Sequence, residues 1–378
     1  MDRQSLLLFL AGGLLPGLLL SGAATYAVRR WAPRWGLVDH PNQRKVHATP
    51  VPLGGGLAIW FGAVASLGLG HLALLLARAI PSVGELAPEF AKPHLDGIGQ
   101  QTGKLWLILG AGTVLMLVGL WDDRFGLTWK LRLAVQFGVA TVCVTFIDNL
   151  RLTAFIDSPL LTGGLSVLWI VGLVNAFNML DNMDALSGGV AAIAAGFLAA
   201  VSLLTPEPGS QGPQLFVAGL LLVVVGSLLG FLWHNRPPAK IFMGDAGSYF
   251  VGFLIAVATL LATYTGYHSE TRHAVLAPLC VMAVPLYDML TVILIRLRAG
   301  KSPFEADKNH FSHRLVDLGF TKPRAVLVVH LLTATCGLAA LLLHRVDLLG
   351  AVVVMLLVGC VLTLIGLLEA TARRTIKG

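Results

Sequence analysis

Eleven long apolar stretches, separated by short polar segments, dominate this chain of 378 residues. A helix that crosses the hydrocarbon core of a bilayer needs about 20 mostly apolar residues. On that criterion we predict membrane spans over 5–28, 53–77, 105–121, 131–147, 163–180, 189–204, 214–233, 248–265, 274–296, 325–343 and 348–370. The sequence therefore predicts an all-α, polytopic integral membrane protein with about 11 transmembrane helices.

The composition excludes the main alternatives to a membrane protein. Only 12% of the residues are charged and 56% are hydrophobic, whereas soluble domains carry about 25% charged residues. This excludes a disordered protein, a coiled coil and an ordinary cytosolic enzyme. The four cysteines lie singly within apolar stretches, so we predict no disulfide framework and no zinc site.

The positive charges predict the orientation in the membrane. With the N-terminus outside, 20 of the 27 Lys and Arg residues fall in cytoplasmic segments. By the positive-inside rule this predicts an external N-terminus and a cytoplasmic C-terminus. The same asymmetry explains the net charge of +7 without a nucleic-acid partner. The first apolar stretch continues to Val28 before Arg29 and Arg30, which indicates a retained span and not a cleaved signal peptide.

The chain is predicted to form a single membrane-embedded domain over residues 1–378. It contains no linker, no low-complexity run and no clear internal repeat. Nearly all the chemically distinctive residues fall in the predicted cytoplasmic segments. These segments are 29–52, 122–130, 178–189, 234–247 and 297–324.

Five aspartates occupy the inner ends of predicted spans: Asp122, Asp123, Asp181, Asp184 and Asp245. Their mutual repulsion opposes convergence unless a cation lies between them, and oxygen ligands at this density suit Mg²⁺ or Mn²⁺. Asp122 and Asp123 lie about 100° apart around a helix. We therefore expect one of them to face the reacting centre while the other orients a partner or metal.

The motif NAFNMLDNMD places polar residues at intervals of three: Asn175, Asn178, Asp181 and Asp184. Each interval falls about 60° short of a full helical turn, so an unbroken helix would point its first and last members in opposite directions. We favour a helix that ends near Asp181 and Asn182.

Basic residues accompany the acids. The segment Arg44-Lys45-Val46-His47 precedes three glycines, Gly54 to Gly56, which either let backbone N–H groups approach a phosphate or allow tight helix packing. Another segment, 307–314, contains His310 and His313 within a basic loop. Acids that hold a divalent metal beside cations that hold phosphates are typical of phosphoryl transfer. Walker A and GxGxxG patterns are absent, which excludes a P-loop or Rossmann nucleotide site. The residues alone indicate a metal-dependent enzyme at the cytoplasmic face that acts on an anionic substrate, with or without a lipid attached.

Five motifs occur in order between about residues 39 and 319: RKVHATPVPLGGG, GLWDDRFGLTWK, NAFNMLDNMD, FMGDAGS and HFSHR. Together they resemble the polyprenyl-phosphate N-acetylhexosamine-1-phosphate transferase family. The resemblance implies an integral enzyme of the bacterial cytoplasmic membrane with its active site on the cytoplasmic face. Such an enzyme transfers a sugar-1-phosphate from a UDP-N-acetylhexosamine to undecaprenyl or another polyprenyl phosphate, releases UMP and requires Mg²⁺. It would catalyse the first membrane step of cell-envelope polysaccharide synthesis, for example of lipopolysaccharide.

The resemblance also implies roles for individual residues. Asp245 matches the family's magnesium ligand, and Asp122 and Asp123 match an aspartate pair of which one deprotonates or positions the polyprenyl phosphate. Phe242 matches an aromatic residue associated with uracil. Polar positions that line the nucleotide and metal region match Asn178, Asp181 and Asp184, and basic positions around the phosphates match Lys45, His47, Lys130, His310, His313 and Arg314.

We accordingly assign His310 and His313 to catalysis together with the aspartate pair, and the other polar, basic and aromatic matches to substrate binding. Asp288 falls where relatives carry an acid, either as the partner of a nearby cation or at the edge of the active site.

The chain departs from the family pattern at three positions. Asn182 and Ala185 stand where relatives commonly carry glycine, and alanine tolerates left-handed backbone geometry less well than asparagine does. Ser312 stands where relatives often carry a third histidine. The missing histidine argues against the branch that uses UDP-MurNAc-pentapeptide, so we predict N-acetylglucosamine-1-phosphate as the transferred group.

Two alternatives remain at this point. Within the same class, the donor is UDP-MurNAc-pentapeptide or another UDP-N-acetylhexosamine. In a different class, an ion-coupled transporter would also carry acids in its membrane segments, but near the middle of the bilayer. The depth of the acids separates these classes. The residues decide neither which of Asp122 and Asp123 is the base nor whether the protein is a homodimer.

Overall fold

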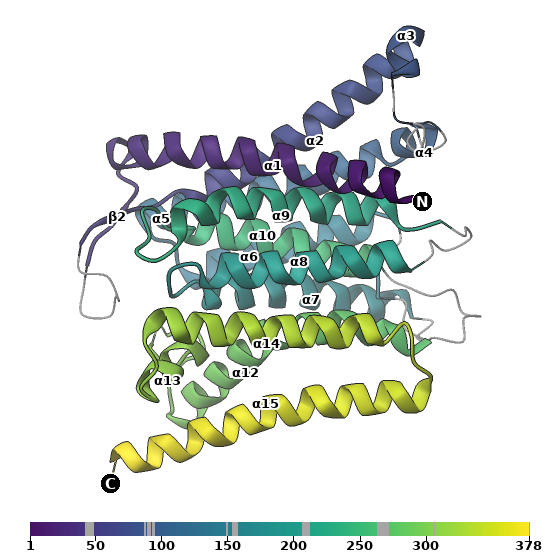
Figure 1. Ribbon diagram of the computed structural model, residues 1–378. Helices are drawn as coiled ribbons and strands as arrows, with labels where there is room; N and C mark the ends of the chain where they lie inside the picture. Colours follow the sequence, from purple (N-terminus) through teal and green to yellow (C-terminus); the bar gives the residue numbers. More distant parts are fainter. Residues whose placement is uncertain are drawn as a thin grey trace.

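The computed structural model describes residues 1–41, 49–86, 88, 92, 95–148, 150–152, 158–205, 212–262, 272–305 and 307–377. Most of the helices run side by side in one bundle, and the two termini lie at opposite ends of it (Figure 1). The helices are α1 (Arg3–Trp31), η1 (Ala32–Trp35), α2 (Gly55–Ala79), α3 (Pro81–Glu85), α4 (Leu95–Gln100), α5 (Thr102–Phe125), α6 (Trp129–Phe146), α7 (Pro159–Leu180), α8 (Leu186–Leu204), α9 (Leu215–Asn235), α10 (Gly244–Leu261), η3 (Arg272–Leu276), α11 (Ala277–Val281), α12 (Ala283–Arg298), α13 (Phe311–Asp317), α14 (Lys322–Leu342) and α15 (Leu348–Lys377). Two short strands, β1 (Val38–Asp39) and β2 (Val51–Pro52), pair antiparallel with Val38 opposite Pro52.

Among the described residues, nine helices are long and apolar enough to cross a membrane, and a bent helix pair raises the number to ten. The predicted span 131–147 corresponds to α6, whose first turns carry Lys130, Arg132 and Gln136. Each of the eleven predicted segments thus contains a helix or a helix pair, and all-α architecture is confirmed. The number of eleven membrane crossings stays a prediction.

We predicted one straight membrane span over 274–296, but the structure has two helical pieces with a sharp bend between them. The chain bends there by 65° between His273–Val281 and Ala283–Arg298. Pro285, in the first turn of α12, has no N–H to donate to the carbonyl of Val281. The helical hydrogen-bond ladder is therefore interrupted at the bend.

Helix α10 lies at the centre of the bundle. In the most apolar 18-residue stretch of α10, 83% of the residues are buried. In the corresponding stretch of the peripheral α1, only 11% are buried. It packs against α5, α7, α2 and α9, with Gly252 placed against the backbone of Val174 in α7. Because small residues let helices approach closely in a membrane, α10 can have neighbours on all sides. Its first turn consequently lies in the middle of one end of the bundle.

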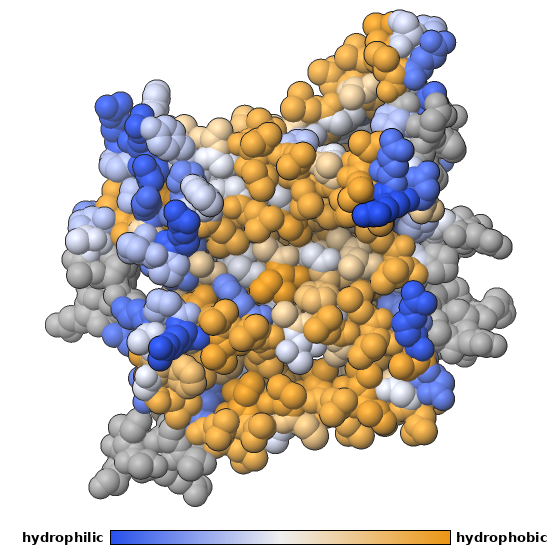
Figure 2. Space-filling model, viewed as in Figure 1, coloured by the Kyte–Doolittle hydropathy of each residue, from blue (hydrophilic) through white to orange (hydrophobic). Residues whose placement is uncertain are grey.

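The surface has the pattern of a membrane protein. Figure 2 shows a broad hydrophobic band between two hydrophilic margins. Exposed tryptophans lie at the ends of α1, α5 and α9 and at the start of α6, at the end of the bundle where α10 begins; they are Trp31, Trp121, Trp233 and Trp129. Tryptophan is enriched where a membrane protein meets the lipid headgroups. The end of the bundle that contains the first turn of α10 is therefore a membrane–water interface.

Ala185, just before α8, adopts the backbone conformation that glycine favours. Its φ is 60°, and it has the only positive φ of a non-glycine residue in the described ranges. Its N–H donates to Oδ1 of Asn235 at 2.8 Å, and its carbonyl lies 3.2 Å from Nε2 of His330. These partners from α9 and α14 hold the turn, so Ala185 keeps a left-handed backbone conformation at an energetic cost.

We expect Ala185→Gly to stabilise the protein by about 1 kcal/mol, because a left-handed conformation costs a residue with a Cβ about 1–2 kcal/mol. Thermal unfolding in detergent measures the change. Ala191→Gly, inside α8 and fully buried, is the matched control and should lower the unfolding temperature. A lower unfolding temperature for Ala185→Gly would contradict this explanation of the turn.

Candidate active site

The acids predicted from sequence come together around the first turn of α10. Asp123, in the last turn of α5, accepts hydrogen bonds from two backbone N–H groups, that of Asp245 at 2.8 Å and that of Ala246 at 3.2 Å. A carboxylate at a helix N-terminus satisfies N–H groups that have no partner within the helix, and it complements the helix dipole. Asp123 therefore orients the helix that carries Asp245.

Gly244 makes this approach feasible. Its φ is 71°, in the left-handed region, and a Cβ at this position would overlap the Asp123 carboxylate. Gly119 of α5 packs in turn against the backbone of Asp245 and Ala246. Glycine is required on both sides of this contact because side chains would separate α5 from α10.

Asp122, beside Asp123, has a different set of partners. One of its carboxylate oxygens accepts from the N–H of Leu127 at 2.6 Å. The other accepts from Nη1 of Arg132 at 2.9 Å and from the hydroxyl of Tyr249 at 3.3 Å. The same Arg132 nitrogen lies 3.7 Å from Oδ2 of Asp245. The two neighbouring aspartates thus divide their contacts as helical geometry predicts: one orients α10, and the other holds a cation beside Asp245.

Sequence reasoning did not single out Arg132. It favoured Lys130, whose exposed ammonium lies 5.7 Å from the ring centroid of Trp129. Lys130 and Arg132 are two positions apart, so their side chains leave the helix in directions about 200° apart. Only one of these two cations can therefore face the acids. The short connection between α5 and α6 could have identified Arg132. Only three residues separate these helices, so the chain turns back and brings Arg132 towards Asp122.

Helix α7 ends at Leu180, which confirms the predicted break near Asp181 and Asn182. Asn178, in its last turn, donates from Nδ2 to Oδ1 of Asp245 at 2.6 Å and to Ser248 at 3.1 Å. Asp184 accepts from the N–H of Ala239 at 2.9 Å. Another amide of the motif, Asn175, instead bonds to Gln136 of α6. The motif therefore contributes both active-site residues and a structural contact.

The pKa of Asp181 is raised from its ordinary value of 3.8 to about 7. Burial is the largest cause, followed by the negative charge of Asp123, and Asp184 adds to the repulsion. The backbone of Gly244 acts in the opposite direction. A carboxylate in this position favours the arrival of a positive charge.

We expect Asp181→Asn to be more stable than the wild type at pH 8 without divalent metal, by about 1–2 kcal/mol after solvent screening. The raised pKa means that the folded state binds a proton more firmly than the unfolded state between about pH 4 and pH 7, so wild-type stability falls as the pH rises through that range. The advantage of the variant should shrink towards pH 5. Unfolding temperatures at pH 5 and pH 8 measure this, and an equal difference at both values would contradict the raised pKa.

Two of the three glycines, Gly55 and Gly56, pack tightly and use their N–H groups within the protein. The N–H groups of Gly55 and Gly56 donate at 2.9 Å to the carbonyls of Phe242 and Met243, and the N–H of Phe242 donates to Pro52. The interpretation that Gly55 and Gly56 contact phosphate is therefore wrong, and the packing interpretation holds. Phe242 is half-buried and is positioned by these bonds. Lys45 and His47 lie outside the described residues.

The segment with the two histidines is joined to the acid cluster. The hydroxyl of Ser312 donates to Oδ1 of Asn182 at 2.6 Å, which ties α13 to the residue that follows Asp181. The ring centroids of His310 and His313 are 6.4 Å apart. Burial lowers the pKa of His313, and the neighbouring His310 and Lys308 lower it further. The imidazole of His313 is therefore predominantly neutral at pH 7.

Arg314 is 3% exposed and uses its guanidinium within the protein. It donates to Glu369 of α15 at 2.8 Å, to the carbonyl of Asn309 at 2.5 Å and to Thr291 of α12 at 3.1 Å. These contacts make Arg314 a residue that holds α13 in place, and the structure shows no basis for the predicted direct contact with a phosphate. Glu369 was missed by sequence reasoning, although a lone acid in the last apolar stretch is an unusual feature.

A divalent cation fits this donor set. No group of three His, Cys, Asp or Glu side chains is arranged to hold a metal within the described ranges. Mg²⁺ does not require one, since it typically takes one or two protein carboxylates and completes its shell with water and substrate phosphate. Asp245, in the first turn of α10, provides such a carboxylate, and the Asp181 carboxylate lies at the backbone of the preceding residue, Gly244.

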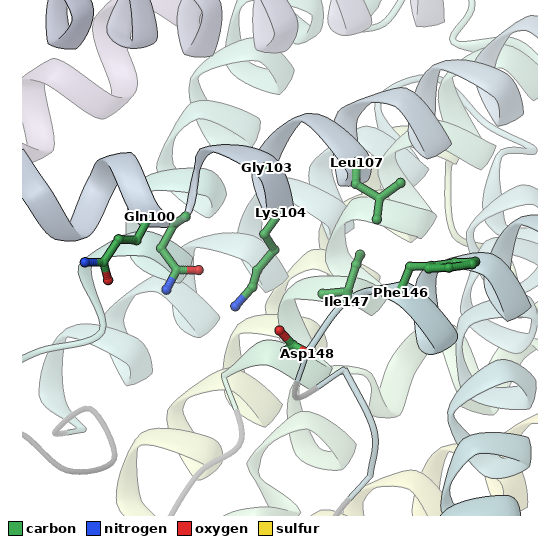
Figure 3. A pocket seen from close by; sticks show the side chains of 8 residues that line it. Gln100, Gly103, Lys104, Leu107, Phe146, Ile147 and Asp148 are labelled. Carbon is green, nitrogen blue, oxygen red and sulfur yellow. The ribbon is translucent and has the colours of Figure 1, made fainter.

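A separate cavity lies far from the acids. It has a volume of about 520 Å³ and is lined by Gln100, Gln101, Gly103, Lys104, Leu107, Phe146, Ile147 and Asp148 (Figure 3). It lies at the first residues of α5, whereas Asp122 and Asp123 are in the last turn of the same helix. With a rise of about 1.5 Å per residue, the helix holds the cavity and the acids at opposite ends of the bundle.

The acids lie at helix ends and not in the middle of the bundle. Asp122 and Asp123 are in the last turn of α5, Asp181 directly follows α7, and Asp245 is in the first turn of α10. Acids at the membrane–water interface suit a membrane enzyme that acts on a substrate from the aqueous side. A transporter would place them near the bilayer midplane.

Comparison with known proteins agrees with this class. Residues 105–263 match the model of glycosyl transferase family 4. The chain is 35% identical to the probable undecaprenyl-phosphate N-acetylglucosaminyl 1-phosphate transferase of Bacillus subtilis (strain 168), over 84% of this chain and 80% of the relative. It is 34% identical to the decaprenyl-phosphate N-acetylglucosaminephosphotransferase of Mycobacterium tuberculosis (strain ATCC 25618 / H37Rv), over 84% and 78%. It is 29% identical to the undecaprenyl-phosphate alpha-N-acetylglucosaminyl 1-phosphate transferase of Yersinia pestis, over 86% and 82%.

The chain therefore belongs to the polyprenyl-phosphate N-acetylhexosamine-1-phosphate transferases of glycosyl transferase family 4.

Proposed function

We propose that this protein transfers N-acetylglucosamine-1-phosphate from UDP-N-acetylglucosamine to a polyprenyl phosphate and releases UMP. The names of the relatives support both the transferred group and the lipid class. The observation that carries the proposal is the convergence of Asp122, Asp123, Asp181 and Asp245 around one helix N-terminus, with Arg132 among them. This arrangement suits a polyanionic substrate that arrives with a cation.

The proposed reaction is an in-line displacement at phosphorus. An oxygen of the lipid phosphate attacks the phosphorus that bears the sugar, a new P–O bond forms, and the pyrophosphate bond to UMP breaks. The second proton of a phosphate monoester has a pKa of about 6, so the attacking phosphate is largely deprotonated at pH 7. Asp122 and Asp123 then serve mainly in positioning, through Arg132 and α10 respectively.

Mg²⁺, which Mn²⁺ can replace by its similar preference for oxygen, would be held by Asp245 with Asp181 nearby. When bound it supplies Lewis-acid neutralisation of the pyrophosphate charge. Asn178 orients the Asp245 carboxylate, and Arg132 adds a fixed positive charge. Phe242, half-buried two residues before Gly244, would pack against the uracil ring.

We further propose that the protein resides in the bacterial cytoplasmic membrane with eleven crossings, an external N-terminus and the active site facing the cytoplasm. The cation asymmetry of the loops supports this orientation. UDP-sugars are made in the cytoplasm, which is consistent with that face.

A transfer assay tests the proposed function. Purified protein is incubated with Mg²⁺, with undecaprenyl or decaprenyl phosphate, and with one UDP-sugar from a panel that includes UDP-N-acetylglucosamine, UDP-N-acetylgalactosamine and UDP-MurNAc-pentapeptide. We expect UMP and a lipid-linked sugar to appear in equal amounts with UDP-N-acetylglucosamine. Transfer only from UDP-MurNAc-pentapeptide, or no transfer from any donor, would overturn the proposal.

A further inference from the structure

Asp288 is a fully buried carboxylate in the bent membrane segment, and its partners are in α13. Its side chain is 0% exposed. One oxygen accepts from Nδ1 of His310 at 2.9 Å, and the other accepts from the backbone N–H of Phe311 at 2.5 Å. A buried carboxylate within a membrane segment is costly unless it is paired. The hydrogen bonds from His310 and Phe311 offset that cost, and they fix the carboxylate and the imidazole relative to each other.

We propose that Asp288 is a positioning residue for the transfer reaction: it holds the His310 ring with Nδ1 protonated, so that Nε2 is the nitrogen available to a substrate phosphate. This inference rests on the proposed function. A carboxylate accepts hydrogen bonds, so Nδ1 must be the donor. In a neutral imidazole the other nitrogen, Nε2, then has a free lone pair that can take up a proton. The imidazolium formed in this way is balanced by the Asp288 carboxylate and donates from Nε2 to a phosphate oxygen.

The surroundings of α13 allow Asp288 to set this geometry. The Phe311 ring packs edge-on against Tyr287, the neighbour of Asp288, with centroids 5.6 Å apart. On the opposite side, Ser312 is bonded to Asn182 beside the acid cluster. His310 itself is 7% exposed. Since α13 is held between α12 and the loop that follows α7, the ring of His310 cannot turn without breaking its bond to Asp288.

The kinetic test is a double-mutant cycle between Asp288→Asn and His310→Gln in the transfer assay. We expect Asp288→Asn alone to lower kcat by about 10–100-fold, with KM for both substrates within about threefold of wild type. In the His310→Gln background, the same substitution should lower kcat less than about threefold, because its effect acts through the imidazole. Equal losses in both backgrounds would overturn the inference.

A second measurement does not depend on activity. In protein labelled with ¹⁵N-histidine, the His310 resonances at pH 8 should show a proton on Nδ1, and His310→Gln identifies them by their loss. Asparagine at position 288 can still accept from Phe311 while its amide group donates to Nδ1, so Asp288→Asn should move the proton to Nε2. Glu369→Gln, which removes the other buried acid that holds α13, is the matched control and should leave the tautomer unchanged.

The two measurements separate the possible failures. If the wild-type protein forms no lipid-linked sugar, the proposed function fails, while the ¹⁵N spectra still decide the role of Asp288. A wild-type His310 with its proton on Nε2, or a tautomer that Asp288→Asn does not change, would overturn the positioning role even in an active transferase.

Discussion

Replacing Asp245 with asparagine is expected to lower kcat by about 1,000-fold or more while the protein remains folded. Removal of one strong electrostatic contact to the developing charge typically costs 10²–10³ in rate, and the loss of a metal ligand adds to that cost. Asparagine keeps an oxygen that can accept from Asn178. The fold around α10 should therefore survive, and the loss should be chemical.

The assay for this prediction is UMP release at saturating concentrations of both substrates, measured over a range of Mg²⁺ concentrations. Asp148→Asn is the matched control, because Asp148 is an exposed aspartate at the opposite end of the bundle. The unfolding temperature of each variant shows whether it is folded. An Asp245→Asn protein that keeps most of its activity would refute the assignment of Asp245 as the metal ligand.

Gly56→Ala is expected to have the largest effect on stability. A Cβ at position 56 would overlap the backbone of Gly247 and Ala246, so α2 and α10 would have to move apart. Backbone cannot rotate out of the way as a side chain can, and overpacking of this kind typically costs 1–3 kcal/mol, occasionally more. We expect Gly56→Ala to lower the free energy of unfolding by about 3 kcal/mol and to lower the yield of folded protein. Activity per folded molecule should fall too, because the N–H of Gly56 holds the carbonyl of Met243, two residues before Asp245.

Gly70→Ala in the same helix is the matched control. A Cβ at Gly70 would have no heavy atom within 4 Å, so alanine should be neutral or slightly stabilising through its higher helix propensity. Thermal unfolding in detergent compares the two variants. Equal unfolding temperatures would mean that α2 and α10 pack less closely than the structure indicates.

The helices were largely predictable, because a segment that crosses lipid must be long and apolar and must satisfy all of its backbone hydrogen bonds internally. The break of α7 after Leu180 followed from the spacing of Asn178, Asp181 and Asp184. The bend between α11 and α12 did not follow from hydropathy, because both halves of 274–296 are apolar and the interruption arises from a missing N–H at Pro285.

The sequence predicted which acidic residues form the candidate site, but it did not predict which residues contact them. Sequence motifs identified the acids and their common end of the bundle, but residue type alone cannot show which cation faces them. Arg132, not Lys130, meets Asp122 because of its angular position on α6. Arg314 has the charge for a phosphate and instead bonds to Glu369, 55 residues along the chain.

From the amino-acid sequence we could conclude that this chain spans a membrane, that its motif acids gather at one end of the helices, and to which family it belongs. These follow from local properties, namely the length of apolar runs, the sidedness of charge and the order of short motifs. Tertiary structure alone decided that Asp123 caps α10, that Gly56 packs against Gly247 and that Asp288 holds His310. Each of these is a contact between residues more than 20 positions apart, and its geometry exists only once the helices have packed.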